Sequence, residues 1–335
     1  MTIVDIAKEA GYSVSTVSRV LNGRRDVSEE ARDRIMRIVE AYQFVPNNNA
    51  KHLKQSVSRS ILILVKGTGN MLFTNILESI QDTIADTNYS LRVHYLDEDA
   101  DEVKSAVQMC REHKPLGILF LGGNIQYFRE EFEAVPVPCV LVTARADKLG
   151  FRNLASVATD DAKAAELAVD YLFDNGHKDI AIIGGDMSMS SPSKYRKKGC
   201  VRSFVKHGRI FDEMMYATAR FSYESAYQAM NRLLEQNRSI TAVFAMSDVM
   251  AIGAMRAIFD KGLSVPKDIS VIGFDGSELA DYFNPKIVTV YQAYEEIARR
   301  SIQLLFGMID FKKPASHELI PFSLKNTESV ANIKL

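Results

Sequence analysis

Residues 60–288 alternate short apolar runs with stretches of helical pattern, and this alternation constrains the fold more than any other feature. Most of the runs are continuously apolar and rich in β-branched residues, which is typical of parallel strands covered on both faces. The expected strands are 60–66, 90–95, 116–121, 137–143, 179–184, 242–245 and 270–273. The expected helices are 74–87, 101–113, 160–175, 193–207, 222–236, 248–261 and 292–310. This alternation predicts an α/β core of two open, doubly wound parallel sheets that bind ligands at the carboxyl ends of their strands.

The first 45 residues follow another pattern, which predicts an all-α unit. Apolar residues recur at helical spacing in Ile3, Ile6, Ala7 and Ala10, then in Val17, Val20 and Leu21, then in Ala31, Ile35, Ile38 and Tyr42. Gly11 allows a sharp turn after the first helix, while Ser13 and Ser28 can cap the second and third. This order predicts a helix-turn-helix, although composition alone would favour a small three-helix bundle with no role in DNA binding.

The outer face of the second expected helix suits a DNA groove. Val14, Ser15, Ser18 and Arg19 form this face, so its side chains are small or hydrogen-bonding apart from one long cation. A helix with such a face can come close to base edges, as readout in the major groove requires.

Several strings of residues resemble the LacI/GalR family of bacterial transcription regulators. They are 2–11, 16–23, 27–28 and 46–47 in the first part of the chain, and 177–185, 248–254, 265–275 and 285–290 in the rest. The resemblance implies a multidomain chain, with a helix-turn-helix headpiece over 1–45, a hinge over 46–59 and an effector-binding core of the periplasmic-binding-protein type over 60–335. It also implies two lobes in this core, about 60–158 with 290–322 and about 159–289 with 323–335.

The segment 46–59 is expected to form a short hinge helix that is marginal alone in water. The resemblance implies that the hinge helices of a dimer enter the minor groove and insert a leucine into the central base step, and Leu53 is the matching residue. Ala50 would allow close approach, and Lys54 would reach the groove or a phosphate. Lys51 stands where many members have arginine, which weakens a forked contact. A flexible tether without DNA contacts is the alternative.

The expected partner is double-stranded DNA with a near-palindromic operator, bound by a homodimer, because one headpiece offers few contacts. The expected DNA-binding residues are Thr2, Ser13, Val14, Ser15, Thr16, Ser18, Arg19, Asn22, Asn47, Ala50, Lys51, Leu53 and Lys54. Residues 324–335 have no heptad run, so the tetramer-forming coiled coil of some family members is not expected.

The resemblance also implies an effector site at the strand ends. Arg196 matches the family arginine that grips ligand hydroxyls or carboxylates, and Asp275 matches the acceptor opposite it. The further candidates are Asn70, Phe73, Ser247, Gln292 and Tyr294, and each candidate could instead be a surface or packing residue. Serine at 247 stands where asparagine is common, and the chain has no tryptophan to stack on a sugar ring. A sugar or sugar derivative is the expected class of effector.

Charge is distributed unevenly along the 335 residues, whose formal net charge is −1. Residues 1–59 hold ten Lys/Arg and seven Asp/Glu, and this basic excess at one end is enough for phosphate contacts by a dimer. No apolar run approaches the roughly 18 residues that span a bilayer, and the N-terminus does not resemble a secretory signal. Three widely spaced cysteines form no metal-ligand pattern, so we expect reduced thiols, a cytoplasmic location and no metal or cofactor.

Two other classes of function compete with DNA-binding regulation. A transport-type solute-binding protein would suit the expected core, but the first 59 residues and the lack of a signal pattern argue against it. An enzyme is not expected either, because Gly184-Gly185 lacks the phosphate-binding glycine patterns and the histidines form no motif. The residues therefore predict a regulator, most simply a repressor, and leave open whether its effector is an inducer or a co-repressor.

Overall fold

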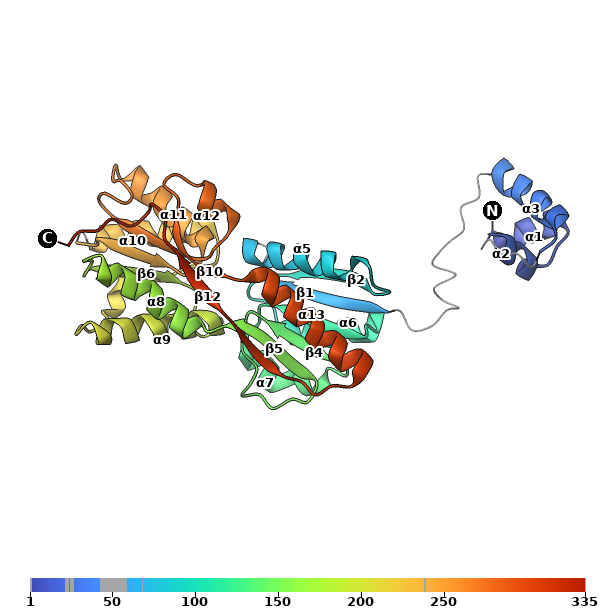
Figure 1. Ribbon diagram of the computed structural model, residues 1–335, viewed down its shortest axis with the longest axis horizontal. Helices are drawn as coiled ribbons and strands as arrows, with labels where there is room; N and C mark the ends of the chain where they lie inside the picture. Colours follow the sequence, from blue (N-terminus) through green and yellow to red (C-terminus); the bar gives the residue numbers. More distant parts are fainter. Residues whose placement is uncertain are drawn as a thin grey trace. The chain divides into compact units, whose positions relative to one another are not determined.

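The computed structural model describes residues 2–21, 24, 27–42, 59–67, 69–237 and 239–334. The chain divides into two compact units, Met1–Ser58 and Arg59–Leu335 (Figure 1). Each unit has hydrophobic clusters of its own. Nearly all of the expected hinge lies outside the described residues.

The described part of the first unit is built from short helices. They are α1 (Ile3–Ala10), α2 (Val14–Leu21) and α3 (Glu29–Ala41), and they share a core of Ile6, Ala7, Ala10, Val17, Val20 and Ile35. Thr2 and Asp5 form a capping box at the start of α1, and Gly11 ends this helix in the left-handed conformation with φ 74°. Ser28 caps α3 by accepting a hydrogen bond from the backbone of Ala31. The predicted all-α helix-turn-helix is confirmed.

The second unit contains two sheets, and the first is wholly parallel. Its described strands lie in the order β11 (His317–Ile320), β5 (Leu154–Thr159), β4 (Cys139–Val142), β3 (Gly117–Leu121), β1 (Ser60–Lys66) and β2 (Ser90–Leu96). Residues of α5 (Met71–Ala85) and α13 (Tyr294–Phe311) form one hydrophobic core on this sheet, whereas α6 (Glu102–His113), α7 (Ile125–Glu131) and the 3-10 helix η1 (Phe132–Ala134) contribute to another. Alternate residues of β1 serve the two cores, because successive side chains of a strand point to opposite faces.

The second sheet has the same layered plan with one antiparallel edge. Its order is β12 (Phe322–Lys325), β10 (Val288–Gln292), β9 (Ser270–Asp275), β8 (Ala242–Ala245), β6 (Ile180–Gly184) and β7 (Tyr216–Thr218), and β12 runs antiparallel to β10. The helices around it are α8 (Asp161–Asp174), α9 (Ser191–Lys206), α10 (Tyr223–Gln236), α11 (Asp248–Asp260), α12 (Glu278–Tyr282) and the 3-10 helix η2 (Glu213–Met215). Figure 1 shows α8 and α9 on one face of the sheet and α10 and α11 on the other.

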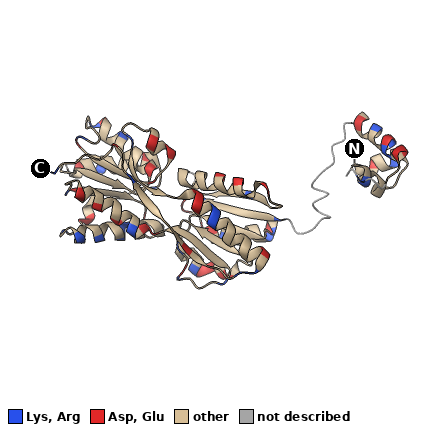
Figure 2. Ribbon diagram, in the orientation of Figure 1, with Lys and Arg blue, Asp and Glu red and all other residues tan. Residues whose placement is uncertain are grey.

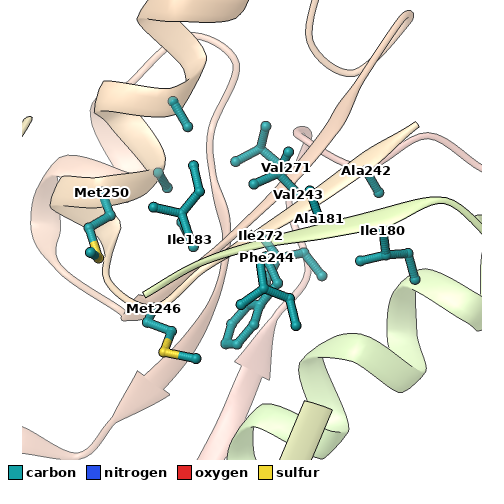
Figure 3. Close-up of a cluster of buried hydrophobic side chains, with 14 of the residues drawn as sticks. Ile180, Ala181, Ile183, Ala242, Val243, Phe244, Met246, Met250, Val271 and Ile272 are labelled. Carbon is teal, nitrogen blue, oxygen red and sulfur yellow. The ribbon is translucent and has the colours of Figure 1, made fainter. Parts of the chain in front are cut away.

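The core of the second sheet combines many alanines with branched aliphatic, aromatic and methionine side chains. Phe244 and Ile272 come from neighbouring strands, while Met246 and Met250 lie at the end of β8 and in α11 (Figure 3). All four side chains are fully buried. The predicted pair of doubly wound parallel sheets is thus confirmed, and burial on both faces explains why the strands read as continuous apolar runs.

The described chain crosses between the two sheets at three places, after β5, β10 and β11. We refer to the half built on the first sheet as lobe one and to the half built on the second as lobe two. Strand β10 pairs with β12 as far as Gln292, so the second crossing falls after this residue and not at 290. Phe322 already belongs to β12, so the crossings lie three residues later than the expected boundary at about 289/290 and one residue earlier than the one at about 322/323.

The expected strands do not include β5, β7, β10, β11 and β12. Strand β7 has only three residues and lies at one edge of the second sheet. Strand β12 lies at the other edge of that sheet and β11 at an edge of the first sheet, and both are partly exposed. These segments therefore lack a continuous apolar run. Helices α7 and α12 are also absent from the expected set, because seven and five residues are too few for a helical period to stand out.

None of the described helices combines the length and the apolarity needed to cross a membrane. The cysteines Cys110, Cys139 and Cys200 are buried and unpaired with one another. Burial raises the pKa of the Cys139 and Cys200 thiols, which therefore remain protonated at neutral pH. Within the described ranges, no cluster of three or more potential metal ligands occurs.

Gly199 tests the close packing of α8 against α9. A Cβ atom at residue 199 would lie 2.0 Å from the backbone carbonyl oxygen of Ala162 in α8. Because the two helices would have to separate, Gly199→Ala should lower the free energy of unfolding by about 1–3 kcal/mol, despite the better helix propensity of alanine. Urea denaturation followed by circular dichroism measures this change.

Gly307→Ala in α13 is the matched control. There the nearest atom to a new Cβ is the Cδ of Lys313 at 3.3 Å, part of a flexible side chain. This variant should keep its stability or gain up to about 1 kcal/mol from helix propensity. Similar losses in both variants would contradict the proposed close contact of α8 and α9.

Candidate functional site

Helix α2 has a buried side and an exposed side. Val17 and Val20 pack into the small core of the first unit, whereas Val14 is 41% exposed. Ser15 and Arg19 are also exposed, and the side chains of Thr16 and Ser18 are half-buried. The accessible side of α2 therefore carries short side chains and one arginine, which is the arrangement that a groove-reading helix needs.

Hydroxyl groups cluster at the N-terminus of α2. Ser13 Oγ lies 2.7 Å from Ser15 Oγ and 2.9 Å from Thr16 Oγ1, and it accepts a hydrogen bond of 3.2 Å from the backbone N–H of Thr16. The expected capping by Ser13 is confirmed. Thr2 lies at the start of α1, where its backbone N–H donates to the Asp5 carboxylate at 2.7 Å. Hydroxyls and helix N-termini of this kind are suited to phosphate contacts.

Charged residues on the headpiece are concentrated on α3. Figure 2 shows basic and acidic residues interleaved along the ribbon of this helix, while Arg19 is the charged residue of α2. The other expected DNA-binding residues, Asn22, Asn47, Ala50, Lys51, Leu53 and Lys54, lie outside the described residues.

A cleft of about 770 Å³ lies between lobes one and two. Its walls include the loops after β1, β2 and β3 of lobe one and after β6 and β7 of lobe two, which are carboxyl ends of strands. Of the effector-site candidates, Asn70, Phe73 and Arg196 line the cleft. A cleft of this size at this edge of two doubly wound sheets can hold a small organic molecule.

Arg196 lies in α9 and is held from two directions. Its Nε donates to Asp161 Oδ1 at 2.8 Å, and its Nη1 donates to the carbonyl oxygen of Met246 at 2.5 Å. The guanidinium carbon lies 3.7 Å from the centre of the Phe274 ring. Only 5% of Arg196 is exposed, so the guanidinium is a rigid, charge-compensated group at the cleft wall.

Asp275 ends β9 just behind this wall, with a φ of 114° that is strained for a residue with a side chain. Its Oδ1 accepts a hydrogen bond of 2.8 Å from Gln292 Nε2, and Gln292 Oε1 accepts one of 2.7 Å from Thr159. Gln292 and Thr159 end the strands that precede two of the lobe crossings. Burial raises the pKa of Asp275, although Arg196 opposes this effect.

Ser247 and Asp248 serve the packing of α11 and do not line the cleft. Ser247 is fully buried and caps α11 by accepting from the backbone of Met250 at 3.2 Å. Asp248 accepts from the Thr289 hydroxyl and from the backbone N–H of Ser277, both at 2.6 Å. Burial raises the pKa of Asp248 as well. An asparagine at position 247 would therefore place its amide at the N-terminal cap of α11 and not in the cleft lining.

The remaining candidates divide between the cleft and its surroundings. Asn70 caps α5 by accepting from the backbone of Leu72 at 3.0 Å, and Phe73 is almost completely buried in the cleft wall. Tyr294 begins α13 and packs edge-on against Tyr291, outside the residues that line the cleft. Thus three candidates line the cleft, Asp275, Gln292 and Ser247 lie behind it, and Tyr294 lies apart.

Two cations in the cleft wall are absent from the expected site. Lys66 ends β1 and pairs with the buried carboxylate of Glu102 at 2.5 Å. Arg220, in the loop after β7, pairs across the cleft with Asp97, Glu98 and Asp99. The sequence shows a lysine at the end of a buried strand and an acidic run after the next strand. It does not show their partners, because these lie far along the chain.

These features define a protein with a DNA-reading headpiece and a two-lobed ligand-binding core, and known proteins show the same combination. Residues 2–47 match the lacI family of bacterial regulatory proteins, and residues 169–330 match a periplasmic binding protein-like domain. The chain is 34% identical over 336 residues to the HTH-type transcriptional regulator MalR of Clostridium butyricum, with 99% of this chain and 100% of that protein covered. The chain belongs to the lacI family.

Solved structures agree with this assignment. The lac repressor dimer bound to operator and the anti-inducer ONPF is 25% identical, with a TM-score of 0.78 and 99% of each chain covered. A complex of the transcriptional regulator CelR with cellobiose shares the fold at 24% identity, with a TM-score of 0.73 and 98% of this chain and 99% of that chain covered. With its full-length relative MalR and its lacI-family match, the chain is a transcriptional regulator.

The buried carboxylate of Asp275 predicts a pH dependence of stability. Because burial raises its pKa, the folded chain retains a proton that the unfolded chain releases, and stability falls as pH rises above the ordinary aspartate pKa of 3.8. Asp275→Asn removes this titration and should flatten the fall, by about 1.4 kcal/mol for each unit by which the pKa is raised. Urea unfolding at a series of pH values measures the slope.

Asp170→Asn should change the slope in the opposite direction. Burial raises the pKa of Asp170, but hydrogen bonds from Lys206 and Ser203 outweigh burial and leave the pKa lowered. The contribution of this carboxylate is therefore present at neutral pH and is lost as pH falls, so the variant should be destabilised at neutral pH and less so in acid. For Asp275→Asn, a fall of stability with pH that is steeper than in the unmodified chain would contradict the raised pKa of Asp275.

Proposed function

We propose that this chain is a repressor that binds a near-palindromic DNA operator as a homodimer and responds to a sugar or sugar derivative in its interlobe cleft. One combination carries the proposal: a single chain holds a capped helix α2 with an exposed polar side and a 770 Å³ cleft walled by Arg196. The operator complex of lac repressor and the cellobiose complex of CelR support the two halves of the proposal.

In this proposal residues 1–45 read the DNA, 46–59 form the hinge and 60–335 bind the effector and dimerise. Thr2 and Ser13 are assigned to phosphate contacts because they lie at helix N-termini. Val14, Ser15, Thr16, Ser18, Arg19 and Asn22 are assigned to the major groove. Asn47, Ala50, Lys51, Leu53 and Lys54 are assigned to the hinge contacts, with Leu53 as the wedge in the minor groove.

The effector would act through the relative arrangement of the lobes. Asn70 and Phe73 belong to lobe one and Arg196 to lobe two, so a ligand that touches both walls favours one arrangement by its differential affinity. An effector that favours the operator-binding arrangement is a co-repressor, and one that favours the other arrangement is an inducer. Asp275 and Gln292 would link the cleft to the crossing strands through their hydrogen bonds.

Selection of genomic fragments by the purified full-length protein tests the proposal directly. We expect recovery of palindromes with two major-groove half-sites about one helical turn apart. The selection is repeated with a metabolite mixture, which separates a protein that needs a co-repressor from one that does not bind DNA. Failure to recover a common site under both conditions would overturn the proposal.

Arg19→Ala should remove discrimination at one base pair in each half-site, by about 1–3 kcal/mol, because arginine can donate two hydrogen bonds to guanine. Competition binding with single-base operator variants measures the loss. Arg37→Ala, an exposed arginine of α3 that donates to the backbone of Asp33, is the matched control and should leave the base preference unchanged. Uniform weakening by Arg19→Ala across all operator variants would refute base readout.

The double variant Arg196→Met with Asp161→Asn should keep operator binding and lose the effector response. Removing both charges together avoids leaving Asp161 buried without its partner, which would cost about 3–5 kcal/mol of stability. The matched control is Arg300→Met with Glu318→Gln, which removes both charges of an ion pair in lobe one outside the cleft lining. Operator affinity is titrated with and without the compounds that affect the unmodified protein, and an undiminished response would show that the effector binds elsewhere.

A further inference from the structure

The cleft is lined by three described cations, and each is already matched by a carboxylate of the protein. They are Lys66, Arg196 and Arg220. Their partners are Glu102 for Lys66, Asp161 for Arg196, and Asp97, Glu98 and Asp99 for Arg220. This pattern bears on the charge of the ligand, because a cation that binds an anionic ligand is most effective when it has no internal counter-ion.

The Lys66 pair is fixed in the wall of lobe one. Only 8% of the Lys66 side chain and 1% of the Glu102 side chain are exposed. Glu102 uses its second oxygen to accept the backbone N–H of Asn124 at 2.5 Å, so the carboxylate is held on both sides. The ammonium group also lies 5.0 Å from the centre of the Tyr127 ring. Lys66 therefore presents N–H donors to the cleft without an uncompensated charge.

The Arg220 cluster joins the two lobes at the rim of the cleft. Its Nη2 lies 2.8 Å from Asp97, while Nε and Nη1 lie 3.4 Å from Glu98 and Asp99. Three carboxylates face one guanidinium here, so this rim carries an excess of negative charge. Asp186 adds a further carboxylate to the lining, which therefore holds four acidic and three basic side chains among the described residues.

Helix N-termini at the cleft would favour anions if their N–H groups were available. Three helices, α5, α9 and α10, start at the cleft with the caps Asn70, Ser190 and Ser222. Each cap accepts a first-turn N–H through its own side chain. Pro192 removes one more donor from the first turn of α9. These N-termini thus offer less to an anion than an uncapped helix would.

We infer that the cleft selects an uncharged, hydroxyl-rich ligand and excludes phosphorylated or carboxylated relatives of that ligand. This inference rests on the proposed function, since it names the charge class of the effector. Compensated cations and carboxylates are donors and acceptors for hydroxyl groups, whereas an added anionic group would meet four carboxylates and no unmatched cation in the described lining. The carboxylates, and not the size of the cleft, then set the selectivity.

Calorimetric titration of the full chain with galactose, galacturonate and inorganic phosphate tests this charge selection. We expect no saturable binding of galacturonate or phosphate to the unmodified protein. The triple variant D97N/E98Q/D99N leaves Arg220 unmatched and should bind both anions with dissociation constants at least about tenfold below the detection limit reached with the unmodified protein, which corresponds to about 1.4 kcal/mol. Glu102→Gln should likewise strengthen anion binding, because it leaves Lys66 unmatched. If Glu102→Gln fails to fold, the triple variant at the exposed rim still tests the inference.

Two results would overturn the inference. One is saturable anion binding by the unmodified protein that is lost in Lys66→Met or Arg220→Gln, because the cations would then be anion sites. The other is unchanged anion affinity in a correctly folded triple variant. The triple variant E78Q/D82N/D86N removes three exposed carboxylates in α5 and at its C-cap, outside the cleft lining, and is the matched control for net charge. Operator binding is measured separately without any ligand, so failure of the repressor proposal is distinguished from failure of the charge selection.

Discussion

The buried ion pair between Arg196 and Asp161 is the interaction on which the second unit most depends. Asp161 begins α8 directly after the first crossing between lobes, and Arg196 lies on the neighbouring helix α9. Charges this deeply buried have to be paired, because loss of one partner leaves the other charge uncompensated in a low-dielectric interior. The guanidinium also reaches the end of β8 and the Phe274 ring of β9, so one side chain ties two helices and two strands together at the cleft.

The same requirement for paired charge governs the rest of the cleft. Parallel strands bring their carboxyl ends to one edge of each sheet, so loops from both lobes meet there with their polar residues. Each cation in that small space has to be matched by the protein, as Lys66 is by Glu102, or by a ligand. The wall that results is polar but rigid, and a ligand bridging the lobes can bias their arrangement at little cost in ordering.

Sequence patterns were most informative where local structure and packing agree. The helix over 14–21 and the continuous strands such as β1 and β9 follow directly from apolar spacing and caps. Edge strands β7, β11 and β12 were not predicted, because an edge position relieves a strand of the need for apolar residues on both faces. The site posed a similar difficulty at Ser247 and Gln292. Their position at the ends of strands predicted a place near the cleft, but it did not show whether each side chain lines the cleft or is buried behind it.

The order of residues alone settled the headpiece, the α/β class of the core and membership of the lacI family, because caps, periodicity and short strings are local properties of the chain. Only the tertiary structure decided which polar residues meet. Lys66 pairs with Glu102, which is 36 residues away in the sequence, and Arg220 pairs with Asp97, which is 123 residues away. The first pair depends on how α6 packs on the sheet of lobe one, and the second depends on how the two lobes are placed against each other. No local pattern encodes either placement. The charge balance of the cleft is therefore a property of the folded lobes.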